Sequence, residues 1–215
     1  MALDSVKTSA KWALKKVGML EVARRHYHAI STPFFYRAKE ARSLPESLCV
    51  ELTNHCNLKC AKCPTYDAKR GRSFMEMELV EKIFSDIGKA KHPVAIAFSG
   101  GGEVILHPNI VDIVELAVKT KNVTKVGITT NGLALNPGLS ERLLRAGLSQ
   151  LKFSTDTTDP ATYLKYNRVD GFAQARANIL EFARLKREGG YTCRIDFKVS
   201  LYKEDQKLVE NMKAF

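Results

Sequence analysis

The chain has 215 residues, a formal charge of +11 at pH 7 and 45% apolar residues, enough to bury the core of a single domain. It contains no run of about 18 apolar residues, so no membrane-spanning helix is expected, and its basic start lacks the continuous apolar centre of a signal peptide. Five cysteines, three of them clustered, favour free thiols in a reducing, cytoplasmic compartment over a disulfide framework.

Residues 1–45 differ from the rest and are predicted to form a basic helical extension. Apolar residues recur there at helical spacing, and nine Lys and Arg against three Asp and Glu supply +6 of the formal charge. We expect this segment to pack on the domain through its apolar stripe. Contact with an anionic membrane surface is a second interpretation. Non-specific nucleic-acid contact is a third, although no nucleic-acid-binding module is recognisable.

From residue 46 to residue 215, strand and helix signals alternate. This alternation predicts one domain with a parallel sheet and right-handed crossovers. Strands are expected at residues 48–52, 94–98, 123–129, 151–154 and 193–199. Helices are expected at residues 75–87, 108–119 and 139–146, from Pro160 onward, and at 173–187 and 203–214. The second strand is rich in apolar residues and is expected to be buried on both faces.

The most informative pattern follows the first strand, where Cys56, Cys60 and Cys63 are spaced CxxxCxxC. Iron–sulfur clusters are held by Cys thiolates, and a [4Fe–4S] cluster normally takes four. Three thiolates therefore leave one iron open to a substrate or cofactor. A zinc site with His55 as fourth ligand is an alternative, although neighbouring residues on a strand point to opposite faces.

The sequence resembles the radical S-adenosylmethionine (radical SAM) superfamily from about residue 47 onward. The resemblance is carried by the three-cysteine motif and by three runs at strand ends: Phe98-Ser-Gly-Gly-Gly-Glu103, Thr130-Asn-Gly132 and Phe153-Ser-Thr-Asp156. The family fold is a partial barrel of six βα units, and five are recognised here. The resemblance thus implies an α/β partial barrel that is shortened at its C-terminus.

The resemblance also implies an enzyme with two cofactors. Cys56, Cys60 and Cys63 would hold a [4Fe–4S] cluster, and S-adenosylmethionine would bind the fourth iron. Reductive cleavage of this cofactor gives a 5′-deoxyadenosyl radical that abstracts hydrogen from an unidentified substrate, with flavodoxin or ferredoxin as electron donor. Cofactor contacts are expected at the carboxyl ends of strands, from Gly100, Gly101, Gly102, Glu103, Thr130, Asn131, Ser154, Asp156 and Lys198.

The residue chemistry supports some of these roles more directly than others. Glycine lets backbone approach a ligand closely, and Glu103 is expected to pair with the ammonium group of the cofactor. A dinucleotide-binding GxGxxG motif is excluded because Ile105 occupies the third glycine position. For Asn131 a turn is the alternative role, and for Asp156 a helix cap. Lys198 either pairs with the cofactor carboxylate or is an exposed strand lysine.

Two positions depart from the family pattern, because Lys62 stands where an aromatic residue is common and Val104 where a proline is usual. Cys49 and Cys193 are interpreted as inert buried thiols. Two other functions remain open: a non-catalytic iron–sulfur module that lost the last barrel unit, and a zinc-binding interaction module. The absent sixth unit keeps the first of these alternatives open.

Overall fold

A computed structural model describes residues 44–63, 65, 71–155 and 157–199 of the chain. The described residues belong to one compact unit that begins at Leu44. Residues 1–43 of the predicted basic extension, the expected helix at 203–214 and Asp156 all lie outside the described residues. Within the described part of the chain, no helix is long and apolar enough to cross a membrane.

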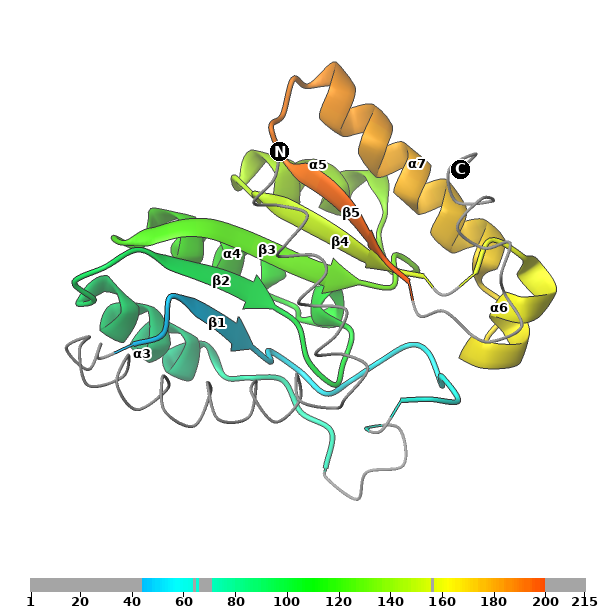
Figure 1. Cartoon of the computed structure of the whole chain (residues 1–215), viewed down its shortest axis with the longest axis horizontal. Helices are drawn as coiled ribbons and strands as arrows, with labels where there is room; N and C mark the ends of the chain where they lie inside the picture. The colour runs from blue at the N-terminus through cyan, green and yellow to red at the C-terminus, as the bar shows by residue number, and fades with distance from the viewer. Residues whose placement is uncertain (1–43, 64, 66–70, 156, 200–215) are drawn as a thin grey trace, which may run out of the picture. The chain divides into compact units, whose positions relative to one another are not determined.

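Five parallel strands form a single sheet in the order β1-β2-β3-β4-β5 (Figure 1). The strands are β1 (Ser47–Val50), β2 (Val94–Phe98), β3 (Val123–Thr130), β4 (Gln150–Ser154) and β5 (Arg194–Lys198). Because spatial order equals chain order, each crossover returns the chain to the adjacent strand, as successive βα units do. The predicted α/β partial barrel of about five units is therefore confirmed for the described residues.

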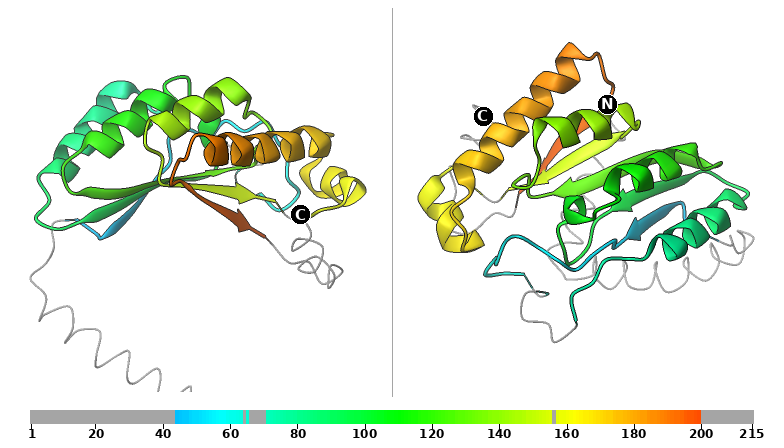
Figure 2. Two further views of the ribbon diagram at one scale, coloured as in Figure 1. Left: turned by 90° about the horizontal axis from the view of Figure 1, so that it is seen from above. Right: turned by 180° about the vertical axis from the view of Figure 1, so that it is seen from behind.

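Helices cover one face of this sheet. The described helices are α3 (Met77–Gly88), α4 (Ile110–Lys119), α5 (Pro137–Arg145), α6 (Pro160–Asn167) and α7 (Phe172–Glu188), with a short 3₁₀ turn η1 (Val104–Leu106). Helices α3, α4, α5 and α7 lie on the same side of the curved sheet (Figure 2). Helix α6 begins as predicted, because the Asp159 carboxylate accepts the Thr162 N–H at 2.8 Å and proline occupies the first turn.

The core lies between the sheet and these helices. Phe98, Phe153 and Phe182 are its largest fully buried side chains. The rings of Phe153 on β4 and Phe182 on α7 meet edge to face, with centroids 6.2 Å apart. This contact helps to hold α7 against strand β4.

Two sequence-based expectations need correction. Strand β2 is buried on one face only, because Val94, Ile96 and Phe98 face the core whereas Ala95 and Ala97 are partly exposed. No described helix covers the second face of the sheet. Helix α4 begins two residues later than expected, because Pro108 and Asn109 form a turn and Asn109 is the residue that caps the helix.

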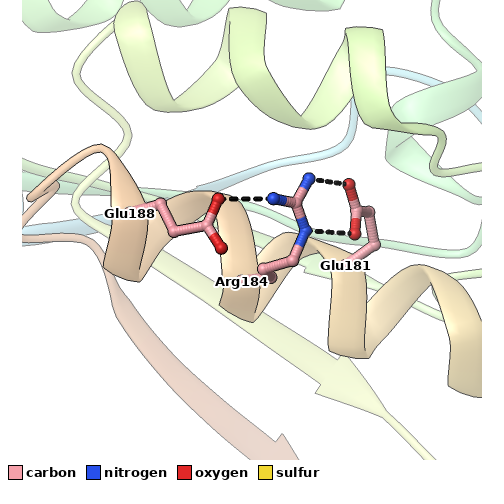
Figure 3. Close-up of polar contacts among 3 residues, drawn as sticks. All are labelled: Glu181, Arg184 and Glu188. Carbon is pink, nitrogen blue, oxygen red and sulfur yellow. Dashed lines mark hydrogen bonds and ion pairs between the residues drawn. The ribbon is translucent and has the colours of Figure 1, made fainter.

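The outer surface of α7 carries a small ion-pair cluster. Arg184 bridges Glu181 and Glu188 on successive turns (Figure 3). Surface pairs of this kind contribute at most about 1 kcal/mol each to stability. The helix is therefore held mainly by its buried face, which includes Ile179 and Phe182.

Candidate functional site

The three clustered cysteines lie on the loop that leaves β1. All three thiols are half-buried. The loop is anchored by the strand bridge between Thr53 and Phe74. Asn54 adds two hydrogen bonds, from its Nδ2 to the Gly71 carbonyl at 2.8 Å and from the Ser73 N–H to its Oδ1 at 2.7 Å. These bonds hold the loop against a segment about twenty residues further along the chain.

Each clustered thiol lies beside a neutral polar side chain. The pairs and their distances are Cys56 with Asn131 Nδ2 at 4.0 Å, Cys60 with Asn167 Oδ1 at 3.2 Å, and Cys63 with Thr65 Oγ1 at 2.8 Å. The partners come from the end of β3, the end of α6 and the loop itself. Three segments distant in sequence thus meet at the cysteine loop.

Glu103 is the most deeply buried charged group of the site, with 3% of its surface exposed. Its carboxylate accepts the Asn131 N–H at 2.7 Å and the Ile105 N–H at 3.3 Å, and the Thr130 hydroxyl is a further partner. Burial raises the pKa of Glu103. Among the described residues, this carboxylate forms no ion pair.

Glu103 also connects the second strand to the cysteine loop. Its backbone N–H donates to the His55 carbonyl at 2.6 Å. The pKa of Cys56 is raised by burial first, and the nearby carboxylate of Glu103 adds to this effect. A cation bound here would compensate the buried negative charge, which is otherwise costly.

The glycine run is packed against the cysteine loop. A Cβ atom at Gly100 would lie 2.5 Å from the Glu51 side chain, and one at Gly101 would lie 2.5 Å from Thr65 Cγ2. At Gly102 the obstacles are backbone atoms, the Thr53 carbonyl at 2.4 Å and the His55 carbonyl at 2.5 Å. Glycine is therefore required at these positions so that the loop after β2 can pack closely against the cysteine loop.

The other predicted contact residues are arranged less tightly. Thr130 is buried, and its hydroxyl accepts the Gly132 N–H at 3.0 Å behind Glu103. Ser154 and Lys198 are register partners at the ends of β4 and β5, and Lys198 is exposed. In the described part of the chain, neither side chain is hydrogen-bonded to the cysteines or to Glu103, so their cofactor contacts remain predictions.

Three polar residues of the site were not predicted. Glu51 accepts the Gly101 N–H at 2.6 Å, and Thr65 donates to the Gly101 carbonyl at 2.8 Å. Asn167 contacts Cys60 across 107 positions of sequence. Glu51 lies inside the strand expected at residues 48–52, whereas β1 ends at Val50 in the structure, and no local signal marks Asn167.

The two cysteines outside the motif differ from each other. Cys193 is buried, as predicted, and burial raises its pKa to about 11. Cys49 is exposed, and its thiol donates to the Ser99 carbonyl at 3.4 Å. The expectation of a buried Cys49 is wrong, because Cys49 is paired with Ala97 on the sheet face that no described helix covers.

The three thiols are chemically suited to a [4Fe–4S] cluster, whose ligands are Cys thiolates. Among the described side chains, no three His, Cys, Asp or Glu converge as one metal ion requires. A [4Fe–4S] cluster binds each thiolate to a different iron, so its ligands stand apart. The ring of His55, the alternative zinc ligand, stacks on Phe74 with centroids 4.5 Å apart.

Comparison with known families and proteins agrees with this geometry. The family model described as the radical SAM superfamily matches residues 50–197. The chain is 34% identical over 128 residues to the GTP 3′,8-cyclase of Chlorobaculum tepidum, covering 58% of the chain and 37% of the relative. It is 32% identical over 164 residues to the molybdenum cofactor biosynthesis protein moc-5 of Caenorhabditis elegans, covering 74% of the chain and 25% of the relative.

The chain thus spans well under half the length of these curated relatives. Among solved structures, it resembles anSMEcpe with bound AdoMet at a TM-score of 0.64 and 18% identity, covering 80% of the chain and 47% of that structure. It resembles BtrN in complex with AdoMet and 2-DOIA at a TM-score of 0.55 and 18% identity, covering 78% and 60%. At this identity, the likeness to the solved structures concerns the fold.

Proposed function

The chain belongs to the radical SAM superfamily, and on that premise we propose that it is an enzyme whose Cys56, Cys60 and Cys63 hold a [4Fe–4S] cluster. The cofactors of this family are that cluster and S-adenosylmethionine. When bound, they supply an electron transfer that cleaves S-adenosylmethionine to methionine and a 5′-deoxyadenosyl radical, which abstracts hydrogen from substrate. The observation that carries the proposal is a loop with three half-buried thiols, one of which, Cys56, lies near the buried carboxylate of Glu103, which forms no ion pair among the described residues.

Glu103 and Asn131 have separate roles in the proposed site. Glu103 is positioned by two backbone N–H groups and would bind the ammonium group of S-adenosylmethionine. Asn131 joins both halves of the site, since its N–H meets Glu103 and its side chain meets Cys56 and Asn57. Burial of Glu103 excludes water and strengthens its attraction for a cation.

The reductant and the substrate are part of the same proposal. A flavodoxin or ferredoxin is a suitable electron donor, and free thiols such as those of this chain suit a reducing compartment. GTP is a candidate substrate because several relatives are named GTP 3′,8-cyclase. The matched region covers less than half of those relatives, so GTP is tested as one substrate among others.

The decisive experiment is anaerobic reconstitution followed by reduction with S-adenosylmethionine, with and without GTP. We expect about four irons and four sulfides per chain, and formation of 5′-deoxyadenosine. Ala variants of Cys56, Cys60 or Cys63 should lose both, whereas Cys49→Ala should keep both. Stoichiometric zinc without sulfide would support the zinc-binding alternative, and a loaded cluster that never cleaves S-adenosylmethionine would support a non-catalytic module.

A further inference from the structure

Helix α6 is fastened to the cysteine loop at its carboxyl end. The Lys59 N–H donates to the Asn167 carbonyl at 3.1 Å, and the Ala61 N–H donates to the Tyr166 carbonyl at 2.8 Å. The Cys60 thiol donates to Asn167 Oδ1 at 3.2 Å. The residue just before Cys60, Cys60 itself and the residue just after it are therefore all bound to the last two residues of one helix.

Asn167 stands apart from an ordinary helix-terminal asparagine because its side chain is buried, with 6% of the residue exposed. It is the last residue of α6, directly before Arg168, which adopts a left-handed conformation with φ of 57°. Free helix carbonyls at this end are satisfied by the loop N–H groups rather than by solvent. The carboxamide is thus directed at one thiol and enclosed there.

The direction of this hydrogen bond must reverse when iron is bound. A Cys60 thiolate carries no proton and can only accept, whereas a carboxamide has an acceptor oxygen and a donor NH₂ group at the same distance from Cβ. A half-turn of the amide exchanges the two. Asn167 can therefore keep its contact with Cys60 in the loaded state, with Nδ2–H as donor.

We propose that Asn167 is a positioning residue of the iron–sulfur cluster, whose carboxamide donates to Cys60 Sγ and favours the reduced cluster. The inference rests on the proposed function, because it requires the cluster at Cys60. Hydrogen bonds to the sulfurs are among the factors that set the reduction potential of such clusters. The reduced cluster carries one more negative charge, so an N–H···S bond stabilises it more than the oxidised cluster.

Two variants separate this role from simple loop support. Asn167→Leu removes the donor at similar size, and Asn167→Asp replaces it with an anionic acceptor. Neither changes the backbone carbonyls that bind Lys59 and Ala61. Asn178→Leu is the matched control, because Asn178 is equally buried at 6% but donates to the Gly132 and Leu133 carbonyls rather than to a cysteine.

The full-length protein is reconstituted anaerobically, its iron and sulfide are measured, and its midpoint potential is determined by redox titration followed by electron paramagnetic resonance. At a fixed applied potential, Asn167→Leu should lower the ratio of reduced to oxidised cluster by up to about tenfold, or about 59 mV for one electron. Asn167→Asp should lower it further because it adds negative charge, and Asn178→Leu should match the wild type.

Both Asn167 variants could instead fail to hold the cluster. This result would also support the inference if the apo-proteins melt at the wild-type temperature and the Asn178→Leu control holds its cluster. Loaded Asn167 variants with the wild-type potential would overturn it and leave the proposed function intact. A wild-type chain that takes up no cluster would overturn the proposed function and this inference together.

Discussion

Gly102→Ala should damage the site without touching any cysteine. The added Cβ would lie 2.4 Å from the Thr53 carbonyl oxygen, 2.5 Å from the His55 carbonyl oxygen and 2.8 Å from Asn54 Cα. All three are backbone atoms of the cysteine loop, so no side-chain rotation relieves the overlap. Either the loop moves or the bond from the Glu103 N–H to the His55 carbonyl breaks.

The expected cost follows from these two effects. Overpacking typically costs about 1–3 kcal/mol, and loss of one hydrogen bond adds about 0.5–1.5 kcal/mol. We therefore expect a loss of about 2–4 kcal/mol in the free energy of unfolding. In urea denaturation followed by circular dichroism, this loss would lower the midpoint by roughly 1–2 M. Cluster content after reconstitution should fall as well, because Cys56 adjoins the displaced segment.

Gly138→Ala is the matched control. Gly138 lies in the first turn of α5, and its nearest obstacle is Asn136 Oδ1 at 3.5 Å, an ordinary contact distance. Alanine there should be neutral or stabilise the chain by up to about 1 kcal/mol. Equal urea midpoints for the two variants would refute the steric argument. So would a Gly102→Ala protein with wild-type stability and cluster content.

Three further predictions concern other parts of the chain. Glu103→Ala should lower the affinity for S-adenosylmethionine by about 10- to 100-fold and leave the iron content unchanged, because a charge-assisted hydrogen bond worth roughly 1.5–3 kcal/mol is lost. An unchanged dissociation constant would show that Glu103 does not bind the cofactor. Because burial raises the pKa of Cys193 to about 11, iodoacetamide at pH 8.5 should label Cys49 and spare Cys193 in the folded chain, and equal labelling of the two in peptide maps would contradict this. The contribution of protonated Cys193 to the free energy of unfolding should be lost as the pH rises from about 8.5 toward the raised pKa of about 11. Deletion of residues 1–45 should promote aggregation at neutral pH if the basic extension packs on the domain, whereas a stable monomer, together with salt-dependent binding of the full chain to anionic vesicles, would favour the membrane-surface interpretation.

The order of elements could be predicted because the sequence repeats one simple signal. Apolar strands alternate with helices that have an apolar stripe, and proline after Asp159 marks the start of α6 as expected. One boundary error occurs where a turn comes directly before a helix. Proline is common in the first turn of a helix, so Pro108 predicts a helix start, whereas Pro108 and Asn109 form a turn and α4 begins at Ile110.

The site could be predicted only as far as its residues cluster in sequence. The three cysteines and the run that ends at Glu103 are local patterns, and the parallel sheet brings both to one edge. Asn167 could not be predicted, because its contact with Cys60 depends on where α6 ends relative to a loop 107 positions away. Thr65 and Glu51 were missed because each acts through the backbone of Gly101, which no side-chain pattern records.

The glycine run has a packing role that its sequence motif does not reveal. The sequence suggests that these glycines allow a ligand to approach the backbone. In the structure, the space beside each glycine is occupied by the cysteine loop or by Glu51. The run therefore packs the segment that carries Glu103 directly against the cysteine loop, so a displacement of one segment moves the other. A substitution in the run should then affect cluster loading and S-adenosylmethionine binding together, whereas Glu103→Ala should affect only the second. That difference distinguishes packing from direct ligand contact.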